Sequence, residues 1–178
     1  MFSACKSEYE QLVETELESG VKYDSLFLGL KFGQTRQEFF DLSWKLNKSI
    51  GLQPGNGNLL EFVLTPPSEE PSPIKMHFYP TFDKEERING MDLKFSYSRW
   101  NIFNDLHSSD RLVQPIIDTL QNWYGKNPFM KLTFEKEPNE IWVKVDGNRR
   151  MAIRKEDDRF LEMKITNLLD QNKNVKKK

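Results

Sequence analysis

Apolar side chains along this chain recur with two periods, one typical of helices and one typical of strands. The helical period follows each of two capping boxes, in which a serine or threonine precedes a glutamate by three residues; they are Ser7 with Glu10 and Thr35 with Glu38. The first predicted helix ends at Gly20 and the second at Gly51. The predicted core-facing stripe of the second helix comprises Phe39, Leu42, Leu46 and Ile50, widened by Phe40 and Trp44.

A third helix is predicted before Gly125, with Ser109 or Asp110 as its capping residue. Pro115 lies inside this segment. Because proline removes a backbone hydrogen bond and clashes with the preceding turn, we expect the regular helix to begin nearer Gln114.

The alternating period predicts seven half-buried strands, three before the third helix and four after it. Their inward-facing residues lie within 60–64, 74–78, 91–97, 130–134, 141–145, 151–153 and 161–165. Asp146-Gly147 predicts a tight hairpin between the fifth and sixth of these strands.

The two halves of the chain share a register. A shift of 70 residues carries apolar positions 60, 62 and 64 onto 130, 132 and 134, and it also carries 91, 93 and 95 onto 161, 163 and 165. We therefore expect an α+β fold of two α-then-antiparallel-β units, each with one helix and three to four strands, with the helices packed on the sheet. Unrelated alternating strands produce the same match, so the duplication stays one of two interpretations.

The predicted organisation has four parts. An N-terminal segment with an acidic helix covers 1–22, a first unit 23–104, a second unit 105–168, and a polar, basic tail 169–178.

Composition narrows the classes of function. The 178 residues are 37% hydrophobic, which is enough for one substantial core or two small fused cores. With 26 basic and 27 acidic residues the net charge is -1, so no global field favours nucleic acid. No apolar run approaches the roughly 20 residues of a transmembrane helix. The single cysteine excludes an internal disulfide and any zinc site that needs several cysteines.

Candidate catalytic chemistry is sparse. His77 and His107 are the two histidines, and neither has the spacing of a metal site or of a Ser-His-acid arrangement. His77 is interpreted as a surface residue and His107 as part of the turn that caps the third helix. We therefore predict no catalytic residue, no metal site and no cofactor, and interpret the chain as a protein that is not an enzyme.

The segment that joins the two halves is the strongest functional candidate. It carries Arg99, Trp100, Ile102 and Phe103, which are the residue types that anchor protein interfaces. Tyr79 and Phe82 are predicted to extend the same patch. The alternative is that Trp100, Ile102 and Phe103 fill the seam between the two units.

Phe2-Ser3-Ala4-Cys5 resembles the end of a bacterial lipoprotein signal peptide, in which the cysteine carries the lipid. Phe2 replaces the usual leucine, and no charged region or apolar run precedes it, so such a signal is truncated in this sequence. The alternative is an incidental cysteine near a cytoplasmic start.

Phe32-Gly33-Gln34-Thr35 with Glu38, followed by an antiparallel meander behind a lipoprotein cysteine, resembles the small lipoproteins of the outer-membrane β-barrel assembly machinery. The tandem arrangement resembles the β-lactamase inhibitor protein fold, and the chain is also similar to uncharacterised lipoproteins of Gram-negative envelopes. The resemblance covers the element order of most of residues 24–167 and transfers no site residue.

This resemblance implies a lipid-anchored binding or scaffolding protein on the periplasmic side of a Gram-negative membrane, with the outer membrane expected. Its implied partner is an envelope protein, and its implied anchor is Cys5. The balanced charge separately predicts that the chain binds no nucleic acid. A small-ligand carrier with a cavity between helices and sheet, or a hydrolase, remains an alternative.

Overall fold

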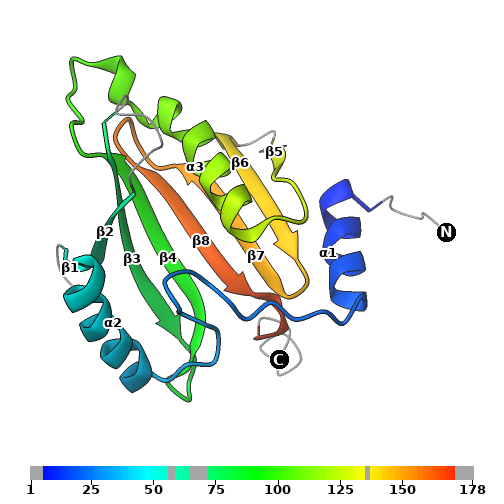
Figure 1. Cartoon of the computed structure of the whole chain (residues 1–178). Helices are drawn as coiled ribbons and strands as arrows, with labels where there is room; N and C mark the ends of the chain where they lie inside the picture. Colours follow the sequence, from blue (N-terminus) through cyan, green and yellow to red (C-terminus); the bar gives the residue numbers. More distant parts are fainter. Residues whose placement is uncertain (1–5, 56–58, 65–71, 135–136, 171–178) are drawn as a thin grey trace.

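The computed structural model describes residues 6–55, 59–64, 72–134 and 137–170. These residues form one antiparallel sheet of eight strands in the order β1-β2-β3-β4-β8-β7-β6-β5 (Figure 1). The helical elements are α1 (Glu8–Glu18), α2 (Arg36–Ile50), η1 (Asp105–His107) and α3 (Ser109–Tyr124). The strands are β1 (Gln53–Pro54), β2 (Leu60–Leu64), β3 (Ile74–Phe82), β4 (Ile88–Tyr97), β5 (Met130–Phe134), β6 (Glu137–Asp146), β7 (Arg149–Lys155) and β8 (Leu161–Asn167).

Both predicted capping boxes are confirmed, because Ser7 and Thr35 each exchange hydrogen bonds with the glutamate three residues later. The predicted end of α2 is also confirmed, since Gly51 follows it in the left-handed conformation. The short strand β1 and the 3-10 turn η1 were not predicted.

The outer face of α2 differs from the prediction. Phe39 is buried, whereas Phe40 and Trp44 are 49% and 65% exposed. Successive helical residues lie about 100° apart, which turns Phe40 and Trp44 away from the stripe formed by Phe39, Leu42 and Leu46. The expectation that they widen the core-facing stripe is therefore wrong, and Ile50 at the end of the helix is also exposed.

The predicted start of α3 near Gln114 is also wrong, because the helix begins at Ser109 and contains Pro115. Proline has no N–H to donate to the carbonyl four residues earlier, which belongs to Arg111. The hydroxyl of Tyr97 donates to that carbonyl instead, over 3.1 Å. A strand residue therefore satisfies the helix carbonyl that Pro115 leaves without its usual donor.

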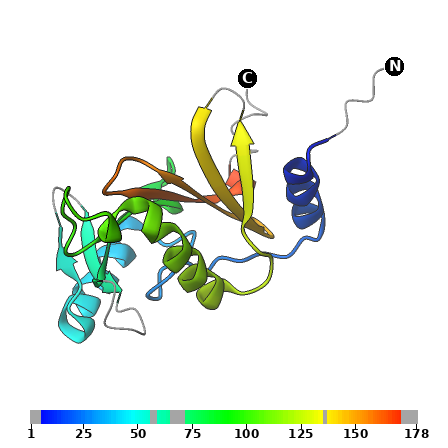
Figure 2. The same cartoon turned by 90° about the horizontal axis from the view of Figure 1, so that it is seen from above.

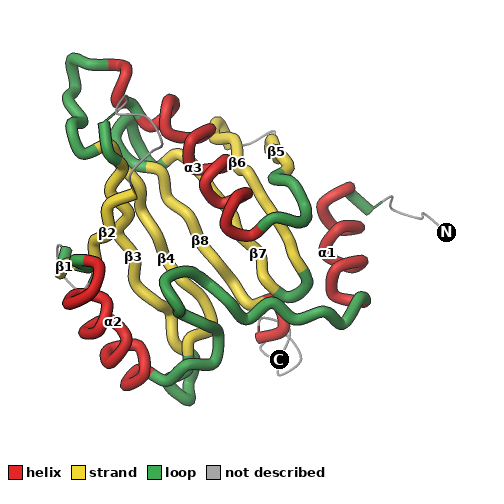
Figure 3. The backbone as a smooth tube through the Cα atoms, viewed as in Figure 1, coloured by secondary structure: helices red, strands yellow, loops and turns green. Residues whose placement is uncertain are grey.

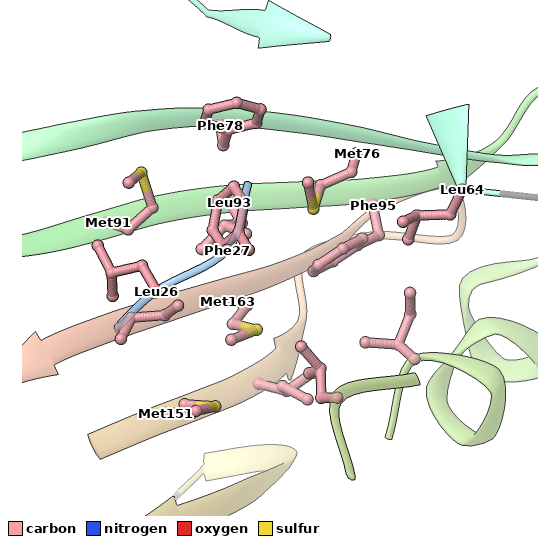
Figure 4. Packing of buried hydrophobic residues seen from close by; sticks show 14 of the residues in the cluster. Leu26, Phe27, Leu64, Met76, Phe78, Met91, Leu93, Phe95, Met151 and Met163 are labelled. Carbon is pink, nitrogen blue, oxygen red and sulfur yellow. The ribbon is translucent and has the colours of Figure 1, made fainter. Parts of the chain in front are cut away.

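The main core lies between the sheet and the helices α2 and α3. Figure 4 shows side chains of β3, β4, β7 and β8 gathered there, including Phe78, Leu93 and Met163. Phe27, from the segment that precedes α2, closes over this layer with its ring edge-on to Phe78 at 4.9 Å. Leu112, Ile116 and Leu120 of α3 complete the core.

A smaller apolar cluster holds α1 against the other face of the sheet. Val143 and Val145 of β6 point toward α1, while the neighbouring Lys144 lies on the face of Met151. Tyr9, Leu12, Val13 and Leu17 of α1 pack on these valines. The two faces of the sheet therefore carry different helices, and among the described residues no helix has the length and hydrophobicity needed to cross a membrane.

The chain is mixed α and β, as expected, but one sheet dominates it. Strands β4 and β8 pair directly at its centre, where Leu93 lies opposite Met163, so the two sets of strands merge rather than form two separate α and β units. Strands β2 and β5, which the 70-residue shift relates, do not occupy equivalent places. β2 lies between β1 and β3, and β5 lies at the far edge beside β6.

Candidate functional site

The loop between β4 and α3 projects beyond the end of the sheet (Figure 3). Its apolar tip, defined here as Ile102, Phe103 and Leu106, is 72%, 93% and 66% exposed. Burying one such side chain stabilises a protein by about 1.5–3 kcal/mol, and here that free energy is not gained within the chain. A group of large apolar side chains held in water is typical of an interaction site.

Hydrogen bonds support the turns of this loop. Ser72, which is fully buried, accepts a hydrogen bond from the backbone N–H of Arg99 at 2.9 Å. The side-chain oxygen of Asn101 accepts from the N–H of Phe103 at 2.9 Å, and that of Asn104 accepts from the N–H of Leu106 at 3.1 Å. These hydrogen bonds favour a defined backbone turn on each side of the apolar tip.

The far end of the loop is tied to the sheet. His107 is buried, with its ring 5.4 Å from that of Tyr97. Ser109 donates from its hydroxyl to the carbonyl of Asp157 at 2.5 Å and from its backbone N–H to that of Asp158 at 2.9 Å. The loop is therefore anchored to β4 at one end and to the turn between β7 and β8 at the other.

The predicted interface residues separate into two groups. Arg99, Ile102 and Phe103 are exposed, so Ile102 and Phe103 do not fill a seam, and Trp100 is half-buried with the Arg159 guanidinium 5.2 Å from its ring centre.

Tyr79 and Phe82 lie at the opposite end of β3 from this loop. The centres of their rings lie 5.8 and 6.2 Å from the centre of the Phe39 ring of α2. The expectation that they extend the patch is corrected, because β3 carries them away from the end of the sheet where the loop begins.

A cluster of buried charged side chains, which was not predicted from the sequence, lies at the end of the sheet opposite the loop. It consists of Lys144, Asp146 and Arg149 around the hairpin between β6 and β7, and all three are buried. Asp146 accepts contacts from the Lys144 amine at 3.1 Å and from the Arg149 guanidinium at 3.3 Å. Its carboxylate therefore offsets the charge of two buried cations.

The cations of this cluster are also bound to backbone carbonyls. Lys144 donates to the carbonyls of Gly125 and Asn127. Arg149 donates to the carbonyl of Ser25 at 2.6 Å and stacks on Tyr124, 4.2 Å from its ring centre. Burial lowers the pKa of Lys144, and the charge of Asp146 opposes that shift.

Glu16 connects α1 to the same hairpin. Its carboxylate accepts from Lys126 at 2.8 Å, from Asn127 at 2.8 Å and from the backbone N–H of Gly147 at 2.7 Å. Burial by itself raises the pKa of Glu16, but the three donors outweigh it and lower the pKa to about 2. α1 is therefore held by a carboxylate as well as by its apolar side chains.

The Glu16 contacts predict acid-sensitive stability. A carboxylate whose pKa is lower in the folded state stabilises the protein above its ordinary pKa of 4.5, and this contribution disappears as the pH falls toward 2. We expect Glu16→Gln to lose about 2 kcal/mol at pH 7 and little at pH 2. Urea unfolding at both pH values measures this, with Glu8→Gln on the exposed face as control. An equal loss at both pH values contradicts the contribution of charge.

Local sequence offered only a faint signal for this cluster. Lys144 and Asp146 alternate with Val143 and Val145, a pattern that by itself is typical of a strand with one solvent-exposed face. Both faces are covered at this end, by α1 on one side and by the turn at 125–127 on the other. The alternating pattern therefore predicted the strand correctly, but it did not predict that the polar face of the strand is buried.

One of the two histidines pairs with a carboxylate on the sheet. His77 lies 2.9 Å from Glu61, which also pairs with Lys75 at 3.0 Å on a half-buried part of the sheet. Within the described residues no group of three or more His, Cys, Asp or Glu side chains is arranged to hold a metal ion. Cys5 lies outside the described residues.

Comparisons of the chain with protein-family models, with curated proteins and with solved structures found no match.

Proposed function

We propose that this chain is a binding or scaffolding protein that contacts another protein through the apolar tip of its 98–108 loop. The observation that carries the proposal is the exposure of Ile102, Phe103 and Leu106 on a loop whose turns are supported by hydrogen bonds. An apolar anchor on such turns loses less conformational freedom on binding than a free segment does, so more of its burial contributes to affinity.

An anchored location in the cell envelope is part of the same proposal. The lipidation site would be Cys5, three residues before α1 begins at Glu8. α1 and the 98–108 loop lie at opposite ends of the molecule in both views (Figures 1 and 2). With a lipid at Cys5, the anchored helix and the apolar tip would lie at opposite ends of the molecule, an arrangement that favours an envelope protein over the membrane itself as the partner.

A small-ligand carrier is the second candidate, and the shapes of the hollows favour it less. A hollow of about 750 Å³ beside Gly33 and Arg87 is open and lined largely by polar and charged residues. Carriers of apolar molecules usually enclose most of the ligand surface in an apolar pocket. A hydrolase has less support, since the loop brings together apolar anchors rather than a nucleophile with a base.

The duplication is proposed as the origin of this arrangement. The shift of 70 residues relates β4 to β8, and the same two strands pair antiparallel with Met91 opposite Ile165 and Phe95 opposite Leu161. Pairing of this kind places the related residues of β4 and β8 about a two-fold axis at the centre of the sheet, a symmetry that β2 and β5 do not follow.

The double variant Ile102→Ser/Phe103→Ser tests the binding role. We expect recovery of the cross-linked partner from native envelopes to fall at least about tenfold, because two buried apolar side chains contribute more than the 1.4 kcal/mol that a tenfold change requires. Melting temperature should stay within about 2 °C, since both side chains are already exposed.

Val63→Ser is the matched control, because Val63 is an exposed apolar residue on β2, outside the loop. Full recovery with the double variant, or equal losses with the control, contradicts the loop as the contact surface.

A further inference from the structure

A second exposed apolar surface lies on the outer face of α2. This ridge consists of Phe40 and Trp44, one helical turn apart, with Lys45 and Lys48 beside them. The Lys48 amine lies 4.8 Å from the centre of the Trp44 ring. Neither lysine forms an ion pair with any described residue, but the exposed Asp41 lies on the same outer face, one turn before Lys45. The α2 ridge therefore presents two aromatic rings with an excess of one positive charge.

A groove of complementary character lies beside α1. It has a volume of about 540 Å³ between α1 and the ends of β7 and β8. Tyr9, Val13, Leu17 and Leu168 supply apolar side chains. Arg150 also lines it, and its guanidinium donates to the Tyr9 hydroxyl at 3.3 Å while its buried Nε has no partner among the described residues.

The charged residues that line this α1 groove are three glutamates with Lys6 and Arg150, which leaves an excess of one negative charge. Glu10, Glu14 and Glu18 line the groove on successive turns of α1. Lys6 pairs with Glu14 at 2.6 Å, whereas Glu10 and Glu18 form no ion pair within the described part of the chain. An anionic lipid or nucleic acid meets repulsion here, while an aromatic surface flanked by lysines meets opposite charge.

We propose that the α2 ridge of one copy of this chain docks into the α1 groove of a second copy. Phe40 and Trp44 would enter between the apolar side chains of the groove, with Lys45 and Lys48 against its glutamates. Arg150 offers a cation to the face of an aromatic ring from the floor of the groove. The ridge and the groove thus match in hydrophobicity and in charge, and this match does not involve the 98–108 loop.

The placement of the two surfaces determines the kind of assembly. α2 and α1 lie on opposite sides of the molecule in both views (Figures 1 and 2). A contact between different surfaces of identical copies is head-to-tail, and each added copy leaves one ridge and one groove open. The expected products are a closed ring or a growing chain rather than a symmetric dimer that stops at two copies.

Sedimentation velocity of the full chain over a range of concentrations tests this proposal. We expect the average mass to rise with protein concentration and to fall at high salt, because the flanking charge pairs are screened. Phe40→Ser/Trp44→Ser should weaken association at least about tenfold at unchanged melting temperature, since both rings are exposed. Ile102→Ser/Phe103→Ser should associate like the native chain.

Charge reversal gives the sharper result. Lys45→Glu/Lys48→Glu and Glu14→Lys/Glu18→Lys should each be monomeric alone, because ridge and groove then carry like charges. Mixed in equal amounts they should associate again, since each variant then meets an opposite charge on the other. A native chain that stays monomeric into the millimolar range, or a mixture that stays monomeric while the native chain associates, overturns the proposal. Retained association of Phe40→Ser/Trp44→Ser overturns it as well, as does binding of the ridge to lipid vesicles without self-association.

Discussion

Replacement of Asp146 by alanine is expected to lower the free energy of unfolding by about 3–5 kcal/mol. The carboxylate is the shared anionic partner of Lys144 and Arg149, and all three side chains are buried. Removing it leaves two interior cations without the group that offsets their lost hydration. For a chain of this length the loss corresponds to a fall in melting temperature of roughly 6–20 °C, measurable by calorimetry and by urea unfolding.

Asp92→Ala is the matched control for this prediction. Asp92 also pairs with a lysine, but its partner Lys164 lies 3.9 Å away and both side chains are exposed. Exposed pairs contribute about 0–1 kcal/mol, so this variant should unfold almost as the native chain does. A loss below about 1 kcal/mol for Asp146→Ala would mean that water reaches the cluster and solvates its cations.

The same cluster explains how segments far apart in the sequence stay together. Arg149 holds the carbonyl of Ser25, and Lys144 holds the carbonyls of the turn that follows α3. Glu16 joins α1 to the hairpin through the N–H of Gly147. The β6–β7 hairpin is therefore the point at which α1, the segment before α2 and the end of α3 meet the sheet.

Elements that depend only on residues close together in the chain could be predicted well from the sequence. A capping box depends on two residues three apart, and a strand face depends on alternation over a few residues, so the first turns of α1 and α2 and the seven longer strands follow directly. A hairpin forms at the predicted place, but its two-residue turn is Gly147-Asn148, with Asp146 paired to Arg149. Its cause is equally local, because this turn needs a positive φ at Gly147.

Features that depend on the three-dimensional arrangement were not predictable in this way. Which strands pair at the centre is decided by the whole set of connections, and β4 beside β8 turns two expected units into one sheet. The exposure of Phe103 is a similar case, since an apolar residue in a connection suits either a seam or a contact surface. Lys144 looked like a solvent-facing strand residue because nothing nearby in the chain indicates that α1 and the turn at 125–127 cover both faces.

Gly147→Ala is expected to destabilise the chain by about 3 kcal/mol, for two reasons that the structure separates. Gly147 has a φ of 52°, which costs a residue with a Cβ roughly 1 kcal/mol. A Cβ at this position also lies 2.3 Å from the carbonyl oxygen of Val21 and 3.0 Å from the ring of Tyr23. The segment that leads away from α1 must then move, and this overpacking adds a further 1–3 kcal/mol.

Gly51→Ala isolates the first of these two causes. Gly51 has a φ of 71° at the end of α2, and no atom lies within 4 Å of a Cβ built there. This variant should therefore lose about 1 kcal/mol, the conformational part alone. Urea unfolding of both variants gives the difference between them, which measures how tightly residues 21–23 are held over the β6–β7 hairpin. Equal losses would show that this segment shifts freely, and that Glu16 and the apolar side chains of α1 hold the helix without it.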